Sequence, residues 1–298
     1  MPLAKPPPLG TRMLPEGTFQ DQVVYITGGG TGIGKAIALE FARLGANIAV
    51  ASRGEEHRRA GVEAVEALGR KAFGSYVDVR DPASIARSFD EVEANLGPVS
   101  VLINNAAGNF PVPSERMSPN AWRAVVSIVL DGTFFCSTEF ARRRIARGEG
   151  GAILNIGAPY VSHGAPVVSH SGAAKAGVDN LTKSLAVEWA PDDIRINTLT
   201  PGLFPVADRS ERSPSGGRDP DNLAFLDSTQ PGGRVGEGRE LGWFATFMCS
   251  PFAAYLTGQT LILDGARALR WYGLGAPVFE PVRDGFDRRQ REAAAARE

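Results

Sequence analysis

The sequence predicts one doubly wound α/β domain, in which helices flank both faces of a mainly parallel sheet of seven strands. Short apolar runs alternate with helical segments along most of the chain, and near-continuous apolar strands are typical of a parallel sheet buried on both faces. The 298 residues would suffice for one large domain or two small ones. No linker divides the series of strands, so we expect a single domain of the Rossmann type.

The elements follow one another as strand and helix. The run VVYIT (Val23–Thr27) predicts the first strand, and a glycine turn then leads into a helix that ends at Arg43. NIAVAS (Asn47–Ser52) predicts the second strand, and apolar residues at helical spacing over 55–68 predict the second helix. Further strands are predicted at 72–79, 99–106, 151–157 and 194–200, with further helices at 82–96, 119–147 and 171–189.

Three segments differ from this pattern. Residues 1–18 are proline-rich and predict an N-terminal arm, either disordered or lying on the surface. Residues 203–235 are rich in Pro, Gly, Ser, Asp and Arg around one apolar island at 223–226, and a loop of that length is typical of a substrate lid. We therefore expect a core domain over 19–265 and a C-terminal extension over 266–298.

Composition excludes several classes of protein. The formal charge of −1 offers no field for nucleic acid. Two cysteines, Cys136 and Cys249, without CxxC spacing exclude a disulfide framework and a cysteine-based zinc site, and indicate a reduced cytoplasmic protein. The apolar stretches are too short and too interrupted by glycine to span a bilayer. Only five of the 32 basic residues are lysines, which indicates a bacterial source.

The glycine turn predicts a dinucleotide site. In TGGGTGIGK, glycines between a strand and a helix allow backbone N–H groups to approach a pyrophosphate, which the positive end of the helix attracts. The alternative is a merely flexible turn, but the strand–turn–helix context favours phosphate binding. The expected contacts are Gly28, Gly29, Gly30, Thr31, Gly32, Ile33 and Gly34.

The end of the second predicted strand indicates which cofactor is bound. NAD requires a carboxylate there for the ribose 2′-OH, whereas a 2′-phosphate requires a cation. This chain has Ser52 and Arg53, with no acid before Glu55. Arg53 could be a solvated surface charge, but its position favours NADPH.

These motifs occur in the order found in short-chain dehydrogenases/reductases, and the chain resembles that family over about residues 19–265. The resemblance rests on TGGGTGIG, DVRD at 78–81, NNAAG at 104–108, the helix around Lys175 and TPG at 200–202. It implies an adenine contact at Asp78 and further cofactor contacts at Val79, Asn105, Ala106, Ala107, Lys175, Pro201, Gly202, Leu203 and Phe204.

Most of the family's usual catalytic tetrad is missing. Ordinary members reduce ketones with Asn, Ser, Tyr and Lys, the Tyr lying four residues before the Lys. Lys175 is present, but Ser171, Ala158 and Val129 stand where the Tyr, Ser and Asn should be. A serine hydroxyl titrates far above the ~10 of tyrosine, so Ser171 cannot donate the proton unaided. Ordinary carbonyl reduction is therefore not expected.

Two interpretations remain from the residues. Either the chain only binds nucleotide, or it transfers hydride with other donors. Tyr160 follows the fifth predicted strand and Asn109 follows the fourth, so both leave the carboxyl edge of the sheet, where ligands bind. A structural tyrosine and a turn asparagine are equally compatible with these positions.

A second resemblance, within the family, favours chemistry. The segment 104–122 and the early GTFQ and ITGGGTG are similar to mitochondrial-type 2,4-dienoyl-CoA reductases, which also have Ser four residues and Tyr 15 residues before the Lys. The likeness implies that Tyr160 and Asn109 are catalytic and that Lys175 holds the nicotinamide ribose beside Ser171. Substrate contacts carried over by position are Arg80, Phe110, Ser118 and Arg212.

The same resemblance implies an activity. It is NADPH-dependent reduction of 2,4-dienoyl-CoA to trans-3-enoyl-CoA in fatty-acid β-oxidation, by a homotetramer that takes an acyl-CoA substrate. The alternatives are another NADP-dependent reductase of enoyl or carbonyl compounds, and a nucleotide-binding pseudo-enzyme.

The chain also departs from these relatives. Gly54 replaces a basic residue after Arg53, which weakens the expected grip on a 2′-phosphate. His170, beside Ser171, is new and is either a tuning group or a polar wall. His163 and His170 are seven residues apart in a Gly/Pro-containing segment, so no metal site is expected.

Overall fold

A computed structural model describes residues 3–161, 163–205 and 220–269, with backbone alone at 220–222. Seven strands form one sheet in the order β3-β2-β1-β4-β5-β6-β7, and every neighbouring pair is parallel. The predicted fold class is therefore confirmed. The strands are β1 Val23–Thr27, β2 Asn47–Ser52, β3 Ala72–Tyr76, β4 Val99–Asn104, β5 Gly151–Ile156, β6 Ile194–Pro201 and β7 Thr260–Leu263.

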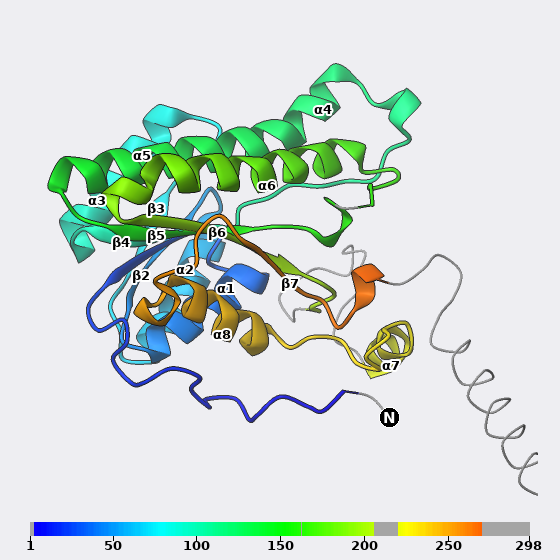
Figure 1. The fold of residues 1–298 in the computed structure, drawn as a ribbon, viewed down its shortest axis with the longest axis horizontal. Helices are drawn as coiled ribbons and strands as arrows, with labels where there is room; N and C mark the ends of the chain where they lie inside the picture. Colours follow the sequence, from blue (N-terminus) through cyan, green and yellow to red (C-terminus); the bar gives the residue numbers. More distant parts are fainter. Residues whose placement is uncertain (1–2, 162, 206–219, 270–298) are drawn as a thin grey trace, which may run out of the picture.

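Helices cover both faces of this sheet (Figure 1). Successive strand residues point to opposite faces, so Val24 and Ile26 enter the core beneath α1 and α8, whereas Tyr25 enters the core beneath α3, α5 and α6. The α-helices are α1 Gly32–Arg43, α2 Glu55–Glu66, α3 Pro82–Leu96, α4 Pro119–Val126, α5 Gly132–Arg147, α6 Ser169–Trp189, α7 Pro220–Ser228 and α8 Gly238–Cys249.

The strand order reverses direction between β1 and β4. The chain passes from β1 outward to β2 and β3, then returns to place β4 on the other side of β1. At such a reversal the connections leave the carboxyl ends of neighbouring strands on opposite sides, which opens a crevice for a ligand. The fold therefore provides a cleft between the turns that follow β1, β2, β4 and β5.

The long predicted helix at 119–147 is interrupted. A π-helical turn, Ser127–Asp131, joins α4 to α5, and the Thr133 hydroxyl donates to the carbonyl of Val129 at 2.7 Å. The whole run Pro119–Arg147 meets the length and hydropathy of a membrane-spanning helix, which the sequence analysis did not expect of any segment. Its side chains Cys136 and Phe140 are instead buried against the sheet, as in a core helix.

The predicted lid contains regular structure. Its apolar island lies in α7, Pro220–Ser228, so this part of 203–235 is helical and not an extended loop. Residues 206–219, which include the predicted substrate contact Arg212, lie outside the described residues, as do residues 270–298 of the expected C-terminal extension.

The N-terminal arm lies on the surface of the domain, the second of the two alternatives for this segment (Figure 1). The Leu3 amide donates to Gly232 at 2.7 Å, and the Arg234 guanidinium donates to the carbonyl of Ala4 at 2.9 Å. Further along, the Trp243 indole donates to the carbonyl of Thr11 at 3.0 Å. The arm therefore contacts both α8 and the segment that follows α7.

Candidate active site

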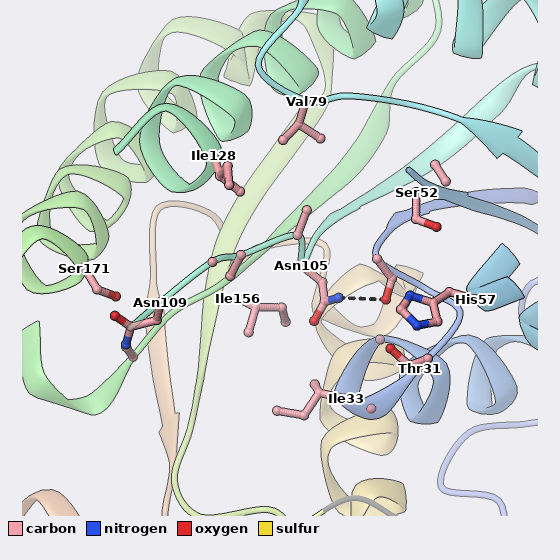
Figure 2. A pocket seen from close by; sticks show the side chains of 18 of the residues that line it. Thr31, Ile33, Ser52, His57, Val79, Asn105, Asn109, Ile128, Ile156 and Ser171 are labelled. Atoms are coloured by element: carbon pink, nitrogen blue, oxygen red, sulfur yellow. Dashed lines mark hydrogen bonds between the residues drawn. The ribbon is translucent and has the colours of Figure 1, made fainter. Parts of the chain in front are cut away.

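A cleft of about 600 Å³ opens at the carboxyl ends of β1, β2, β4 and β5. Figure 2 shows Thr31, Ser52 and His57 at one end and Asn109 and Ser171 at the other. The first is called here the nucleotide end and the second the reaction end. The predicted residues that line the cleft are Gly28, Thr31, Gly32, Ile33, Gly34, Ser52, Arg53, Asp78, Val79, Asn105, Ala106, Ala107, Asn109, Tyr160, Ser171, Lys175, Pro201 and Phe204.

The glycine turn fits a dinucleotide phosphate. Gly28 and Gly32 adopt positive φ angles of 68° and 58°, which glycine tolerates best. A Cβ on Gly34 would lie 2.4 Å from the carbonyl oxygen of Gly28, so a side chain there would displace the turn. Thr31 makes no side-chain cap to α1, and the first turn of α1 carries no acid. The helix N-terminus is thus available to an anion.

Asn105 holds this turn in place. Its side-chain amide donates to the carbonyls of Thr27 at 2.9 Å and Gly28 at 3.1 Å, while the hydroxyl of Thr27 accepts from the amides of Asn105 and Ala106. The end of β4 is therefore bonded to the end of β1. This explains why an Asn follows β4 in a chain with a glycine turn after β1.

The turn after β2 forms the far wall of the nucleotide end. Arg53 is exposed and lines the cleft, whereas Arg58 is held by the carbonyls of Ser52 at 2.8 Å and Arg53 at 2.9 Å. His57 lines the cleft as well, a contribution that the sequence analysis missed. It lies five residues beyond the strand, on α2, where no spacing rule pointed to it.

Asp78 lines the cleft after β3, but its carboxylate is already paired. The guanidinium of Arg80 donates to both of its oxygens, and this hydrogen bonding lowers the pKa of Asp78 to about 2. Arg80 does not line the cleft. The structure therefore places Arg80 as the partner of Asp78 near the nucleotide end, and not at the reaction end as expected of a substrate contact.

Lys175 is buried at the reaction end, on α6. Its ammonium donates to the carbonyl of Ile156, the last residue of β5. Burial lowers the pKa of Lys175 to about 8. The bond fixes the amine at the carboxyl end of the sheet, where the cleft lies.

Tyr160 and Ser171 form the central pair of this end. Their hydroxyl oxygens are 2.7 Å apart and share a hydrogen bond, and both residues line the cleft. Ser171 comes from α6 and Tyr160 from the short 3₁₀ turn after β5, so the displaced tyrosine does meet the helix that carries Lys175. Asn109, exposed after β4, lines the same cleft.

His170 lies directly behind this pair. It is fully buried, its Nδ1 accepts the Ser171 amide at 2.8 Å, and its ring packs edge-on against Phe110 with centroids 4.9 Å apart. Because Nδ1 accepts, the neutral ring carries its proton on Nε2. That nitrogen has no hydrogen-bond partner within the described residues.

A buried polar network supports the cleft from below. The Asn104 amide donates to Ser137 at 3.0 Å and to Asn155 at 2.9 Å, and the amide of Asn155 donates to Thr182 at 2.9 Å. Thr182 shares a further bond of 2.9 Å with Thr198. This network ties β4, β5 and β6 to α5 and α6.

Some predicted residues are not brought to the cleft. Phe110 packs on His170, and Ser118 is the N-cap of α4, where its hydroxyl accepts the Ala121 amide at 3.1 Å. Leu203 lines a separate cavity of about 150 Å³. A Cβ on Gly30 or Gly202 would come within 3.0 Å of a neighbouring segment, and one on Gly29 would lie 3.0 Å from Ile26. These glycines therefore allow close packing behind the cleft and do not line it.

The lining also includes residues that the sequence analysis did not select. Most of these residues lie at the end of a strand or in the turn after it, so a rule based on strand ends would have found that majority. His57 and Ile128 lie in helical segments, where such a rule does not apply. The full set of these additional lining residues is Ala51, Gly54, His57, Val77, Gly108, Ile128, Ile156, Gly157 and Ala158.

The strand order and glycine turn are those of nucleotide-dependent oxidoreductases of the short-chain dehydrogenase/reductase family, and the chain belongs to that family. A family model described as enoyl-(acyl carrier protein) reductase matches residues 28–266. The chain is 36% identical to a short-chain dehydrogenase structure from Bacillus anthracis, with a TM-score of 0.76 over 85% of this chain and 98% of that one. It is 32% identical to a gluconate 5-dehydrogenase from Burkholderia cenocepacia in complex with NADP and tartrate, with a TM-score of 0.75 over 85% and 97%.

Several curated relatives carry a more particular name. A probable 2,4-dienoyl-CoA reductase of Bacillus subtilis, described as (2E)-enoyl-CoA-producing, is 37% identical over 85% of this chain and 99% of its own. The mouse peroxisomal 2,4-dienoyl-CoA reductase, described as (3E)-enoyl-CoA-producing, is 36% identical over 88% and 92%.

Proposed function

We propose that the protein is an NADPH-dependent 2,4-dienoyl-CoA reductase that acts in the β-oxidation of unsaturated fatty acids. One observation carries the proposal: the Tyr160 hydroxyl lines the cleft and is bonded to Ser171, at the helix position where a ketone reductase would have its tyrosine. The names of the relatives from Bacillus subtilis and mouse support the same substrate class.

The nucleotide end fits the cofactor. The glycine turn and the N-terminus of α1 would hold the diphosphate, Arg53 would pair with the 2′-phosphate, and Lys175 would bind the nicotinamide ribose. When bound, NADPH supplies a hydride. The remaining steps depend on what the reaction end does for the substrate.

The reaction end supplies neutral hydrogen-bond donors. When the substrate gains a hydride at C5, its C4–C5 π electrons move toward the thioester and charge collects on the thioester oxygen. Tyr160 and Asn109 donate hydrogen bonds to that oxygen and stabilise the dienolate, each by about 3 kcal/mol of the barrier. A proton from water then adds to C2 to give the trans-3-enoyl thioester. No acid has to protonate the oxygen, which explains how the enzyme dispenses with the usual tetrad.

The experiment follows NADPH oxidation with 2,4-hexadienoyl-CoA, acetoacetyl-CoA and a free dienoate. We expect turnover of the dienoyl thioester, and product NMR should place the double bond between C3 and C4. Protonation at C4 would instead give the 2-enoyl product in the name of the Bacillus subtilis relative. Turnover of acetoacetyl-CoA alone would contradict the proposal, and tight NADPH binding without any turnover would favour a pseudo-enzyme.

We also propose a homotetramer in a reducing cytoplasm. Trp122, Phe134 and Ile145 are each 41% exposed along α4 and α5, while Phe252, in the 3₁₀ turn after α8, is 61% exposed and Ile262, on β7, is 50% exposed. A tetramer with two kinds of interface would bury exposed apolar side chains in two separate parts of the chain. Both cysteines are free and buried, as suits a reducing compartment. Light scattering on the purified protein should give the mass of four chains. A mass of one or two chains would contradict the proposed tetramer.

A further inference from the structure

If NADPH is the cofactor, the turn after β2 offers less positive charge than the 2′-phosphate of NADPH would need. A phosphate monoester carries about −1.5 to −2 charges near neutral pH, and Arg53 offers one positive charge. Arg58 is held by the carbonyls of Ser52 and Arg53 and lies 5.7 Å over the ring of Tyr76. The other nearby guanidinium, that of Arg80, is paired with Asp78. Among the described residues of this turn, one cation therefore faces a group that calls for two.

His57 stands where the second cation is needed. Its imidazole lines the cleft together with Arg53 and folds over Gly54, such that a Cβ at position 54 would lie 3.1 Å from its Nδ1. Gly54 is the position at which the resemblance implies a basic residue in the relatives. The ring thus occupies the space that a side chain at 54 would enter, and the glycine makes that space available.

The backbone of His57 is fixed against the phosphate-binding turn. A Cβ on Gly30 would lie 2.0 Å from the carbonyl oxygen of His57, so the first turn of α2 and the glycine turn are in direct backbone contact. Figure 2 shows His57 at the same end of the cleft as Thr31 and Ser52. His57 is therefore held at the nucleotide end by the backbone contact between α2 and the glycine turn.

We propose that His57 is a second, pH-dependent ligand of the 2′-phosphate of NADPH, so that the preference for NADPH over NADH increases as the pH falls. This inference rests on the proposed use of NADPH and gives its site a further specificity-determining residue. Imidazoles gain their charge between pH 8 and pH 5, whereas a guanidinium is charged throughout. Only the histidine can make the preference depend on pH in that range.

The charged groups around His57 do not provide this dependence. Carboxylates and guanidiniums in general do not titrate between about pH 6.5 and pH 8. The phosphate itself takes up a proton near pH 6, which weakens binding at lower pH and opposes the effect of the histidine. The groups in the turn, on α2 and after β3 are Arg53, Glu55, Glu56, Arg58, Asp78 and Arg80.

The test measures dissociation constants of NADPH and NADH by the fluorescence of the bound nicotinamide at about pH 6.5 and about pH 8. For the unaltered protein we expect the NADPH-to-NADH preference to increase roughly 3- to 10-fold at the lower pH. His57→Gln should remove that increase. His57→Lys should keep the preference high at both pH values, which would show that charge and not ring shape is required. His163→Gln, at an exposed position, is the matched control.

The outcomes separate the two proposals. Equal pH dependence in the unaltered protein and His57→Gln would overturn the role of His57 while leaving NADPH as the cofactor. A shift of NADH affinity by the same factor would also overturn it, because NADH has no 2′-phosphate. No preference for NADPH at either pH would overturn the cofactor proposal and this inference with it. Loss of dienoyl-CoA turnover with the pH-dependent preference intact would overturn the substrate class alone.

Discussion

The two ends of the cleft are built from different parts of the chain. The nucleotide end consists mainly of backbone: a glycine turn with two positive φ angles, a helix N-terminus, and glycines whose Cβ atoms would collide with other segments. The reaction end consists of side chains from three separate segments, Asn109 after β4, Tyr160 after β5, and Ser171 with Lys175 on α6. The nucleotide end can therefore tolerate little change in the shape of its backbone. The reaction end can tolerate little change in the functional groups of its side chains.

This difference determines how each end responds to substitution. A lost hydroxyl at the reaction end leaves the backbone in place, so binding persists while turnover falls. An added methyl group at the nucleotide end moves backbone, so binding and stability fall together. The predictions below test this division, beginning with the largest expected effect.

Removal of the Tyr160 hydroxyl should have the largest effect. Tyr160→Phe keeps the ring but removes one of two donors to the thioester oxygen, and loss of such a donor lowers kcat about 10²- to 10³-fold. Stopped-flow measurement of NADPH oxidation should show this decrease, with little change in the dissociation constant of NADPH. The exposed Tyr255→Phe is the matched control.

Ser171→Ala sharpens the same test. It leaves the tyrosine present but removes its partner at 2.7 Å, so we expect a decrease in kcat of about 10-fold, smaller than that of Tyr160→Phe. If Ser171→Ala were the more damaging of the two, the serine would be the donor to the substrate and Tyr160 its support.

A methyl group on Gly34 tests the nucleotide end. The new Cβ would lie 2.4 Å from the Gly28 carbonyl oxygen and 2.6 Å from the Asn105 amide nitrogen, so the turn must move. We expect Gly34→Ala to weaken NADPH binding about 10- to 100-fold and to lower the free energy of unfolding by about 2 kcal/mol. Titration and urea denaturation would measure the two effects.

Gly232→Ala is the control for that substitution. Its Cβ would meet the end of the Leu3 side chain at 2.7 Å, and this side chain can move aside. Binding of NADPH should therefore be unchanged. If Gly34→Ala retained full affinity, the turn would be adaptable and the nucleotide end would not depend on backbone shape.

The same division explains what the sequence could and could not predict. The glycine turn and Ser52–Arg53 were predictable because each is contiguous in the chain and adjoins a strand end. The meeting of Tyr160 with Ser171 was predictable only through resemblance, since the spacing of 11 residues carries no rule when a turn and a helix start lie between them. His57, five residues past the strand, and the pairing of Arg80 with Asp78 depend on side-chain direction, which composition and periodicity do not contain.

The buried ammonium of Lys175 should lower the free energy of unfolding of the protein. Burial lowers the pKa of Lys175 from 10.5 to about 8, so below pH 8 the folded protein holds a buried ammonium. Lys175→Met should therefore raise the free energy of unfolding at neutral pH by roughly 1–3 kcal/mol, reduced by the donor lost to the Ile156 carbonyl. The nicotinamide ribose would lose its ligand, so turnover should fall.

The free energy of unfolding should depend on pH in a direction that follows from the lowered pKa of Lys175. Between about pH 8 and 10.5 the unfolded chain keeps a proton that the folded chain has released, so the stability of the unaltered protein rises with pH there. The advantage of Lys175→Met should shrink across this window in urea denaturation. Lys183→Met, at a 57% exposed position paired with Asp179, should change stability by less than about 0.5 kcal/mol at any of these pH values. A constant advantage would mean that the folded and unfolded states release the proton of Lys175 over the same pH range, so that burial does not lower its pKa.

His170 should have the smallest effect and tests whether the reaction end also depends on backbone. Its Nδ1 accepts the Ser171 amide in the first turn of α6, while Nε2 has no hydrogen-bond partner within the described residues. His170→Phe removes an acceptor and an unsatisfied donor together, so the free energy of unfolding should change by less than about 1 kcal/mol. If the bond positions Ser171, kcat should still fall about 3- to 10-fold, a loss of roughly 1 kcal/mol. His163→Gln, whose ring bonds to the next carbonyl in the described part of the chain, should change neither quantity. An unchanged kcat in His170→Phe would mean that α6 alone orients Ser171, and the reaction end would then depend on side-chain chemistry without this backbone support.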